Sequence, residues 1–245
     1  MSVGVVLILG AGSDIGRACA HFFAAKGHTI QLAARAPDRL TADQTDLQLR
    51  YGVSVSLHAV DALETDTHAD FVQALPVLPD VAISVIGLLG THTKNLKDTA
   101  SAVQILRSNF EGPATLLGAL ATRFEARGSG TLVGVSSVAG NRGRASNYIY
   151  GAAKAGFTAY LSGLRHRLFP SGVHVVTVLP GFVDTAMTQG MNLPPRLTAQ
   201  PGQVAEAIYY AIVKKRNIIY FKPIWRVIMA IIWALPEEVF KRTRL

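Results

Sequence analysis

A tyrosine and a lysine at helical spacing are the first candidates for chemistry in this sequence. The segment "SNYIYGAAKAG", residues 146–156, contains Tyr148, Tyr150 and Lys154. Residues four apart share a face of a helix, so Lys154 should lie beside Tyr150, whereas Tyr148 should point elsewhere. A lysine cation favours the phenolate and lowers a tyrosine pKa of about 10 toward the range of general acid–base catalysis. Tyr150 is therefore the candidate acid, and an ordinary amphipathic helix is the alternative.

Seven apolar runs predict the sheet that must position these residues. The runs are rich in Val, Ile and Leu with little polar alternation, as expected for strands buried on both faces. They occupy residues 3–9, 28–34, 53–59, 80–86, 130–136, 173–179 and 217–221. Segments of helical period lie between them, at 15–27, 38–50, 65–75, 99–127, 148–168 and 201–214. The sequence predicts a doubly wound, Rossmann-type α/β fold, with a seven-stranded parallel sheet and helices on both faces.

The loop after the first predicted strand is rich in glycine. It reads "LGAGSDIGRA" and opens the first helix. Glycines there permit a tight turn, close approach of the backbone to a pyrophosphate and close helix–strand packing, and the helix N-terminus attracts an anion. This position predicts a dinucleotide site, with a plain turn in which Asp14 is the N-cap as the alternative. The expected contact residues are Gly10, Gly12, Ser13, Asp14, Ile15 and Gly16.

The end of the second predicted strand bears on the choice of cofactor. The segment "LAARAPDRL" places Arg35 there and no acidic residue before Asp38. An Asp or Glu at this point would be expected to bind the ribose hydroxyls of NAD. A guanidinium suits the 2′-phosphate of NADP instead, and Arg17 and Arg39 could add contacts. We therefore expect a preference for NADP(H), with NAD(H) as the alternative.

Taken together, these motifs resemble the short-chain dehydrogenase/reductase family over about residues 5–221. The resemblance rests on the Gly-rich turn, on Ser137 thirteen residues before Tyr150, on Lys154 four residues after it, and on "PGFVDT" at 180–185. It implies that Tyr150 donates a proton and that Ser137 holds the substrate carbonyl. It also implies that Lys154 binds the nicotinamide ribose and lowers the pKa of the tyrosine.

The resemblance extends to residues outside this triad. Asn109, in "RSNFEG", looks like the family's fourth catalytic residue, which helps to position a water that relays protons through the lysine. Asp61, in "HAVDA", looks like its adenine-contacting aspartate. Thr185 would reach the nicotinamide carboxamide. The residues implied to lie along the nicotinamide are Pro180, Gly181, Val183 and Thr185.

The sequence also departs from the family pattern. Leu9 stands for the usual Thr, Asp14 for the middle glycine, and "VIGLLG" at 85–90 for Asn-Asn-Ala-Gly. These changes alter phosphate contacts without removing the proposed chemistry. Several segments, among them "SDIGRA" and "SSVAGNRGRASNYIYGAAKAG", also resemble the reductases that complete the epimerisation of decaprenylphosphoryl ribose. That narrower resemblance implies a lipid-linked keto sugar as a lead for the substrate.

Length and composition bound the class of protein. The 245 residues contain no linker, repeat or low-complexity tract, so we expect one catalytic domain over 1–222 with an extension at 223–245. The single cysteine and the absence of a basic leader predict a cytoplasmic location. No metal site is expected. Of the net charge of +8, residues 214–245 carry +6, so no basic face for nucleic acid is expected.

The extension at 223–245 is expected to be an apolar and basic helix. Residues 224–235 are apolar except for Arg226 and would span only about 18 Å, against roughly 30 Å of hydrocarbon, so they should not cross a membrane. Such a helix could cap the substrate pocket or pack on a second subunit. Trp225 and Trp233, with flanking basic residues, suit instead peripheral contact with the inner face of the membrane.

These features predict a carbonyl reductase that prefers NADPH and interconverts a ketone and a secondary alcohol, with Tyr150 as the general acid or base. The substrate would be a small-molecule or lipid-linked carbonyl compound. The helices expected at 99–127 and 148–168 are implied by the resemblance to form a homodimer or homotetramer. The rival hypothesis is a non-catalytic dinucleotide-binding protein that acts as a sensor or structural partner. Intact Ser137, Tyr150, Lys154 and Asn109 argue against it.

Overall fold

The predicted seven-stranded sheet forms the centre of the molecule. The computed structural model describes residues 3–243, and every pair of neighbouring strands in the sheet is parallel. Their order is β3-β2-β1-β4-β5-β6-β9. It reverses between β1 and β4, which is where doubly wound sheets bind ligands. The strands are β1 (Val5–Leu9), β2 (Thr29–Ala34), β3 (Val55–Ala59), β4 (Val81–Ser84), β5 (Thr131–Val135), β6 (His174–Pro180) and β9 (Ile218–Phe221).

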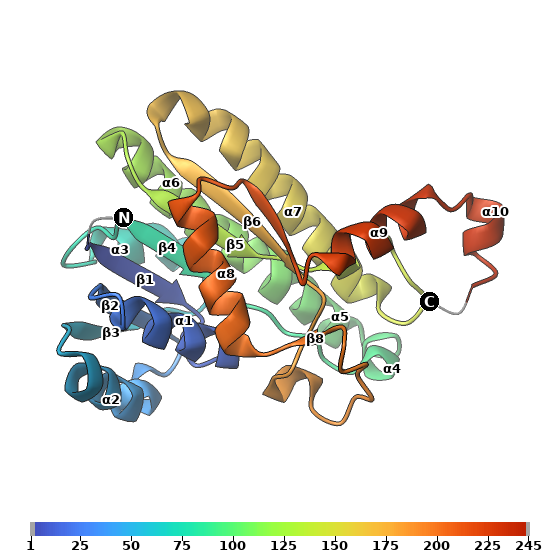
Figure 1. Cartoon of the computed structure of the whole chain (residues 1–245), viewed down its shortest axis with the longest axis horizontal. Helices are drawn as coiled ribbons and strands as arrows, with labels where there is room; N and C mark the ends of the chain where they lie inside the picture. Colours follow the sequence, from blue (N-terminus) through green and yellow to red (C-terminus); the bar gives the residue numbers. More distant parts are fainter. Residues whose placement is uncertain (1–2, 244–245) are drawn as a thin grey trace.

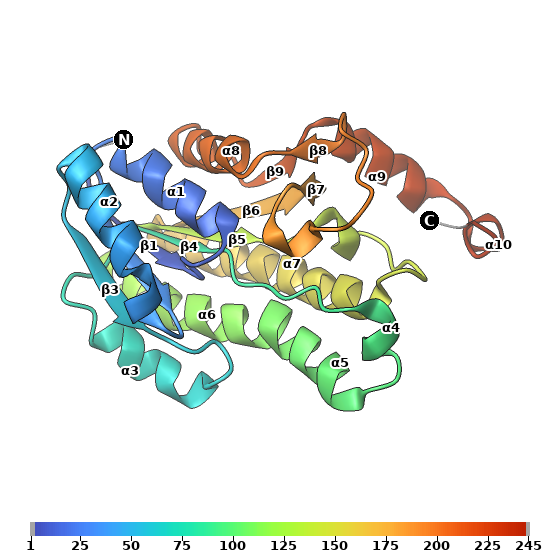
Figure 2. The ribbon, with the colours of Figure 1, turned by 90° about the horizontal axis from the view of Figure 1, so that it is seen from below.

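Helices cover both faces of the sheet, as the two ribbon views show (Figures 1 and 2). On one face, a core cluster joins the sheet to α1 (Asp14–Ala24), α2 (Thr41–Tyr51) and α8 (Pro201–Val213). On the other, a second cluster joins it to α3 (His68–Gln73), α6 (Gly112–Arg127) and α7 (Tyr148–Leu168). Burial on both faces explains why the strands read as nearly continuous apolar runs.

The helix expected at 99–127 is interrupted by a π-helical turn. The chain forms α5 (Thr99–Leu106), the turn Arg107–Glu111, and then α6. Pro113 in the first turn of α6 has no N–H, and in a regular α-helix its ring would clash with the carbonyl of Asn109. The wider π-helical turn avoids this clash. The segment expected to be helical at 99–127 is helical throughout, and the π-helical turn, which the pattern did not predict, lies in the part that contains Asn109.

Several short elements at the carboxyl edge of the sheet had no counterpart in the predicted pattern. They include the helix α4 (His92–Asn95) and a two-stranded parallel sheet of β7 (Phe182–Val183) and β8 (Thr198–Ala199). Turns of 3-10 helix at this edge occupy Val138–Gly140 and Ala186–Thr188. Elsewhere, 3-10 turns at Pro37–Leu40 and Thr65–Thr67 begin the helical segments predicted at 38–50 and 65–75, and Phe169–Ser171 follows α7. Figure 1 places β8 and α4 beside the end of the sheet.

The C-terminal extension forms α9 (Ile224–Ala234) and α10 (Glu237–Phe240), which project beyond the sheet (Figure 1, red). One side of α9 is buried, because Trp225, Met229 and Ile232 pack against Val138 and Leu179. Trp225 is only 4% exposed, so its expected place in lipid headgroups was wrong. Within residues 3–243, the helices are too short or too polar to span a bilayer.

Candidate active site

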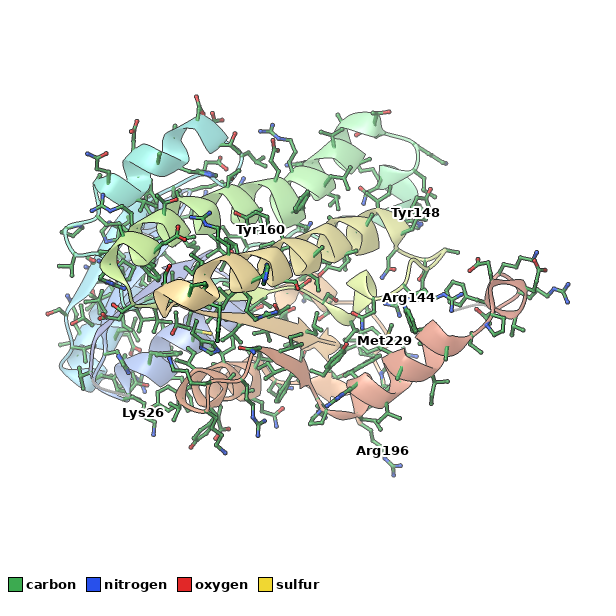
Figure 3. The ribbon with its side chains drawn as sticks, turned by 90° about the horizontal axis from the view of Figure 1, so that it is seen from above. Lys26, Arg144, Tyr148, Tyr160, Arg196 and Met229 are labelled. Carbon is green, nitrogen blue, oxygen red and sulfur yellow. The ribbon has the colours of Figure 1, made fainter. Side chains whose placement is uncertain are left out.

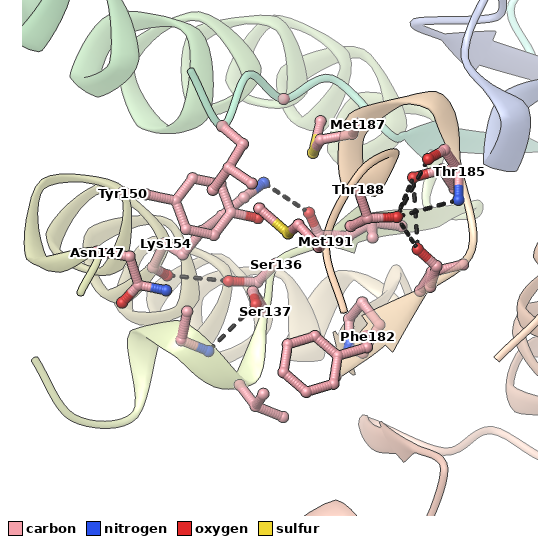
Figure 4. A pocket seen from close by; sticks show the side chains of 18 of the residues that line it. Ser136, Ser137, Asn147, Tyr150, Lys154, Phe182, Thr185, Met187, Thr188 and Met191 are labelled. Carbon is pink, nitrogen blue, oxygen red and sulfur yellow. Dashed lines mark hydrogen bonds between the residues drawn. The ribbon is translucent and has the colours of Figure 1, made fainter. Parts of the chain in front are cut away.

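Ser137, Tyr150 and Lys154 line one cavity of about 320 Å³ at the carboxyl edge of the sheet (Figure 4). Ser137 follows β5 in extended conformation, and its hydroxyl accepts a hydrogen bond of 3.1 Å from the Ala139 N–H. Tyr150 and Lys154 lie in the first turns of α7. Strand β5 and helix α7 thus bring the three side chains together from a span of eighteen residues.

Within this group, Lys154 lies beside Tyr150. Its Nζ is 5.8 Å from the centroid of the Tyr150 ring and donates a hydrogen bond of 3.1 Å to the Val135 carbonyl. Tyr148 is half-exposed and packs edge-on against the ring of His92, with centroids 5.3 Å apart. The two tyrosines therefore have different surroundings, and Tyr150 alone lines the cavity.

Burial shifts the pKa values of both groups. It raises the pKa of the Tyr150 phenol to about 12, although the Ser137 side chain acts in the opposite direction. It lowers the pKa of the Lys154 ammonium to about 7. The expected lowering of the tyrosine pKa by the lysine is therefore not what this structure gives, because loss of solvation disfavours both charged forms.

Asn109 lies in the π-helical turn and is fully buried. Its amide donates hydrogen bonds to the carbonyls of Leu88 (2.6 Å) and Ile105 (2.8 Å), and its Oδ1 accepts one from the Leu88 N–H (3.1 Å). A Cβ at Gly87 would lie 3.0 Å from Asn109 Oδ1 and 3.4 Å from Lys154 Nζ. Gly87, which was not among the predicted site residues, therefore allows the segment at 85–90 to pass close to both.

The Gly-rich turn lines a second cavity of about 330 Å³ with Arg35 and Asp61. Gly10 has a φ of +85°, a conformation that side chains rarely adopt, and a Cβ on it would lie 3.1 Å from Ile86. At Gly16 a Cβ would lie 2.7 Å from the Gly10 carbonyl oxygen. A close backbone turn at a helix N-terminus fits a pyrophosphate.

The polar residues around this turn have different partners. Ser13 is the N-cap of α1, because its Oγ accepts a hydrogen bond of 3.1 Å from the Gly16 N–H, so the alternative of Asp14 as the cap was wrong. Arg17 pairs with Asp43 at 2.9 Å and is thereby engaged within the protein. Arg35 is exposed at the mouth of the second cavity. Among the residues that line this cavity, Arg35 therefore offers a guanidinium that a ligand can reach.

A family model described as short chain dehydrogenase matches residues 4–195. The chain belongs to the short-chain dehydrogenase family. It is 35% identical over 242 residues to an uncharacterised oxidoreductase of Mycobacterium tuberculosis (strain ATCC 25618 / H37Rv), covering 97% of this chain and 96% of the relative. It is 32% identical over 241 residues to an uncharacterised oxidoreductase of Streptomyces coelicolor, covering 97% and 94%. The protein is therefore an oxidoreductase.

Solved structures share the fold of this short-chain dehydrogenase. One is a short-chain dehydrogenase from Burkholderia cenocepacia J2315 in complex with NADP, with a TM-score of 0.82, 20% identity and coverage of 98% of this chain and 97% of the other. Another is a short-chain dehydrogenase from Sphingobium yanoikuyae in complex with NADPH, with a TM-score of 0.79, 23% identity and coverage of 96% and 97%. At these identities the similarity establishes the fold.

The segment from the last residue of β6 to the residues after β7 lines the active-site cavity of the short-chain dehydrogenase. Pro180, Gly181, Val183 and Thr185 all line that cavity. Asp14 accepts a hydrogen bond of 2.8 Å from the Ala186 N–H, which links this segment to the Gly-rich turn.

The C-terminal extension forms another wall of the cavity through Trp225. A Cβ at Gly181 would overlap the Trp225 ring, whose Nε1 donates to the Leu197 carbonyl at 3.2 Å. Phe182 packs edge-on against the same ring. Of the three alternatives for the extension, a helix that caps the substrate pocket is the one that agrees with the position of Trp225.

In residues 3–243, no cluster of His, Cys, Asp or Glu could hold a metal ion.

Proposed function

We propose that this short-chain dehydrogenase reduces a ketone to a secondary alcohol, or catalyses the reverse reaction, with NADP(H). The observation that carries the proposal is the meeting of Ser137, Tyr150 and Lys154 in one cavity at the carboxyl edge of the sheet. The Gly-rich turn lines a neighbouring cavity, and residues 85–87 line both. A dinucleotide could therefore extend from one cavity into the other.

In this proposal the bound dinucleotide supplies or accepts a hydride. The Ser137 hydroxyl donates a hydrogen bond to the substrate carbonyl oxygen, and the Tyr150 hydroxyl gives that oxygen a proton as the ketone becomes an alcohol. Because burial raises its pKa to about 12, the phenol holds its proton at neutral pH. The Lys154 cation stabilises the phenolate left behind, and Asn109 supports the backbone beside Lys154.

The proposed cofactor contacts follow from the second cavity. Backbone N–H groups around Gly12 and Ser13 would bind the pyrophosphate, and Asp61 would lie near the adenine. Arg35 would pair with the 2′-phosphate, which NADP has and NAD lacks. Two structural neighbours are complexes with NADPH or NADP, which supports this assignment.

Turnover of NADPH tests the proposed reaction. The full-length protein should oxidise NADPH in the presence of at least one member of a panel of small ketones and lipid-linked keto compounds. Tyr150→Phe should lose at least about 100-fold in kcat but still bind NADPH, because the hydroxyl acts on the substrate. Tyr148→Phe is the matched control, since Tyr148 does not line the cavity.

Two outcomes would contradict this assignment. A Tyr150→Phe variant with normal kcat would exclude the tyrosine as the acid. NADPH binding without oxidation by any ketone would favour the non-catalytic sensor or structural partner. A structural neighbour described as a bulky-bulky ketone specific alcohol dehydrogenase from Comamonas testosteroni (TM-score 0.78, 21% identity) suggests that bulky ketones belong in the panel.

We also propose that the outer side of α9 contacts a membrane and presents the cavity to a hydrophobic or lipid-linked substrate. Its exposed side chains include Ile224, Val227, Ile231 and Trp233, of which Trp233 is 72% exposed. Arg226 is exposed on the same helix and could contact anionic headgroups. No Asp or Glu occurs in α9.

Co-sedimentation with vesicles of anionic phospholipid tests this membrane contact. The full-length protein should pellet with the vesicles and be partly released by high salt. Ile231→Ser should weaken pelleting severalfold, whereas Leu49→Ser, at an even more exposed apolar position on α2, should not. Point substitutions are preferable to truncation because Trp225 packs into the catalytic domain. A native protein that stays in the supernatant would exclude the contact.

A homodimer or homotetramer is proposed through the exposed apolar side of the α5–α6 segment. The apolar side chains of Val103, Leu106 and Phe110 are 45%, 39% and 38% exposed there. A second copy of the chain packed on this side would bury them. Light scattering should give the mass of a dimer or tetramer. Val103→Asp should lower that mass, and a native protein with the mass of one chain would contradict the proposal.

A further inference from the structure

Three polar side chains that the proposed reaction does not use line the active-site cavity. They are His92 in α4, and Arg144 and Asn147 in the segment before α7. Each has a buried atom without a hydrogen-bond partner among residues 3–243, namely His92 Nε2, Arg144 Nε and Asn147 Oδ1. Buried polar groups normally have partners, so three unsatisfied groups in one cavity indicate a ligand.

Arg144 contributes an unpaired cation to this group. Burial lowers the pKa of its guanidinium, and no ion pair of Arg144 occurs among residues 3–243. Arg142, two residues earlier, instead pairs with Glu237 at 2.9 Å and donates to three backbone carbonyls. A half-buried guanidinium without a counter-ion is costly, so an anion from outside would stabilise it.

The rest of the cavity provides no counter-ion. Among the described residues that line it there is no Asp or Glu, whereas Lys154 adds a second cation. His92 is held edge-on against Tyr148, and its Nε2 can donate a hydrogen bond. The Asn147 side chain can donate as well, because a half-turn of its amide puts the NH2 group in the place of the unpaired Oδ1. Figure 3 shows Arg144 between Tyr148, at the start of α7, and Met229 of α9.

We propose that Arg144, His92 and Asn147 bind an oxyanion carried by the substrate, either a carboxylate or a phosphate ester. A guanidinium binds both groups through paired N–H donors, which a neutral carbonyl compound cannot match. This inference rests on the proposed carbonyl reduction, because it places the anion in the same cavity as Tyr150. Arg144 does not line the Gly-rich cavity, so its anion is distinct from the phosphates proposed there.

Three ketones with one carbon skeleton test the subsite: a neutral methyl ester, the corresponding carboxylate, and a phosphate ester. With saturating NADPH, kcat/KM of the native enzyme should be at least about tenfold higher for an anionic ketone than for the neutral one. Arg144→Gln should reduce that ratio about tenfold, chiefly through KM, and Arg144→Lys should reduce it less. The preferred anion distinguishes carboxylate from phosphate.

Arg196→Gln is the charge-matched control, because Arg196 is exposed and does not line the cavity (Figure 3). It should keep the native ratio. Equal kcat/KM values for the neutral and anionic ketones in the native enzyme, or an unchanged ratio in Arg144→Gln, would overturn the inference.

Binding of inorganic phosphate and of acetate provides a test that is independent of turnover. In the presence of NADPH, either anion should change the fluorescence of Trp225, which lines the same cavity, and Arg144→Gln should weaken that binding about tenfold. If the native protein reduces no ketone but Arg144→Gln binds the anions more weakly than the native protein does, the subsite is supported and the proposed reaction is refuted. If the native protein reduces ketones but both proteins bind the anions equally well, the reaction is supported and the subsite is refuted.

Discussion

The group proposed to be catalytic and the part of the cavity around Arg144 and His92 differ in how their polar atoms are satisfied. Lys154 donates to the Val135 carbonyl, and the Asn109 amide makes three hydrogen bonds within the protein. Arg144 and His92, in the same cavity, each keep a buried nitrogen without a partner among residues 3–243. Groups fixed by the fold are suited to a constant chemical step, and unsatisfied groups are suited to recognition of a particular substrate. The difference suggests that reaction and selectivity reside in separate sets of residues.

The largest expected effect comes from removing the buried cation with Lys154→Met. We expect kcat to fall by about 100-fold or more, because no charge then stabilises the Tyr150 phenolate. The same change should stabilise the protein at neutral pH. Burial lowers the Lys154 pKa from 10.5 to about 7, so the unfolded chain binds more protons between these values. The free energy of unfolding of the native protein should therefore rise with pH across that window.

Thermal unfolding as a function of pH measures this second effect. At pH 7, the stability gained by removing the buried charge should exceed the stability lost with the hydrogen bond to the Val135 carbonyl, which is worth about 1 kcal/mol. A net gain of about 1 kcal/mol would raise Tm by roughly 2–4 °C. Lys97→Met, at an exposed position, should leave both Tm and kcat nearly unchanged. A Lys154→Met protein that is less stable than the native one at every pH would refute the argument.

The next effect concerns Arg35, which the fold leaves exposed at the cofactor cavity. Arg35→Ala should remove on the order of tenfold of the preference for NADPH over NADH, because a charge-assisted contact to the 2′-phosphate is lost. Fluorescence titration of each cofactor measures the two affinities. Arg39→Ala should change the ratio little. Equal affinities for NADPH and NADH in the native protein would show that Arg35 does not select the cofactor.

The parts of the molecule predicted from sequence are those that local pattern determines. All seven strands were confirmed, because burial on both faces leaves apolar runs that are hard to mistake. Helix α7 has the predicted bounds, Tyr148–Leu168. The spacing of Ser137, Tyr150 and Lys154 is likewise local, and the structure places them in one cavity. The positions of these groups could therefore be predicted, whereas their pKa values depend on burial.

The contacts that arrange the segments around the cavity could not be predicted, because they join residues far apart in the sequence. Asp14 contacts Ala186 across 172 residues, and Arg142 contacts the end of α9 across about 90. The unsatisfied state of Arg144 becomes visible only when every surrounding side chain is placed. The π-helical turn at Asn109 is an intermediate case, since Pro113 inside a helical pattern was a local signal for it.

A severalfold effect is expected when the C-terminal extension is loosened by Arg142→Gln. The Arg142 guanidinium donates to the carbonyls of Ile232 and Leu235, both at 2.6 Å, and lies 3.8 Å from the centroid of the Phe240 ring. It thereby satisfies carbonyls at the end of α9. Without it, we expect faster hydrogen exchange over 224–243 and a KM for ketone raised about threefold, because Trp225 forms part of the cavity wall.

The matched control for the extension is Arg226→Gln on the exposed side of α9. It removes the same charge without touching these carbonyls, so hydrogen exchange over 224–243 should stay close to that of the native protein. If Arg142→Gln also leaves exchange unchanged, the extension is held by its apolar contacts alone.

The smallest effect is expected at Asp14, which links the Gly-rich turn to the segment after β7. Its carboxylate accepts the Ala186 N–H at 2.8 Å and so holds the segment after β7 against the Gly-rich turn. Asp14→Ala should raise the KM for ketone about twofold, because the loss of one partly exposed hydrogen bond is worth about 0.5–1.5 kcal/mol and is shared among several contacts. The same change removes a negative charge beside the proposed pyrophosphate site and should strengthen NADPH binding slightly.

Asp14→Asn keeps an acceptor for the Ala186 N–H but removes the charge, so it should show the tighter NADPH binding without the higher KM. Steady-state kinetics and NADPH titration of both variants separate the two roles, and identical changes in the two would show that charge alone acts at this position.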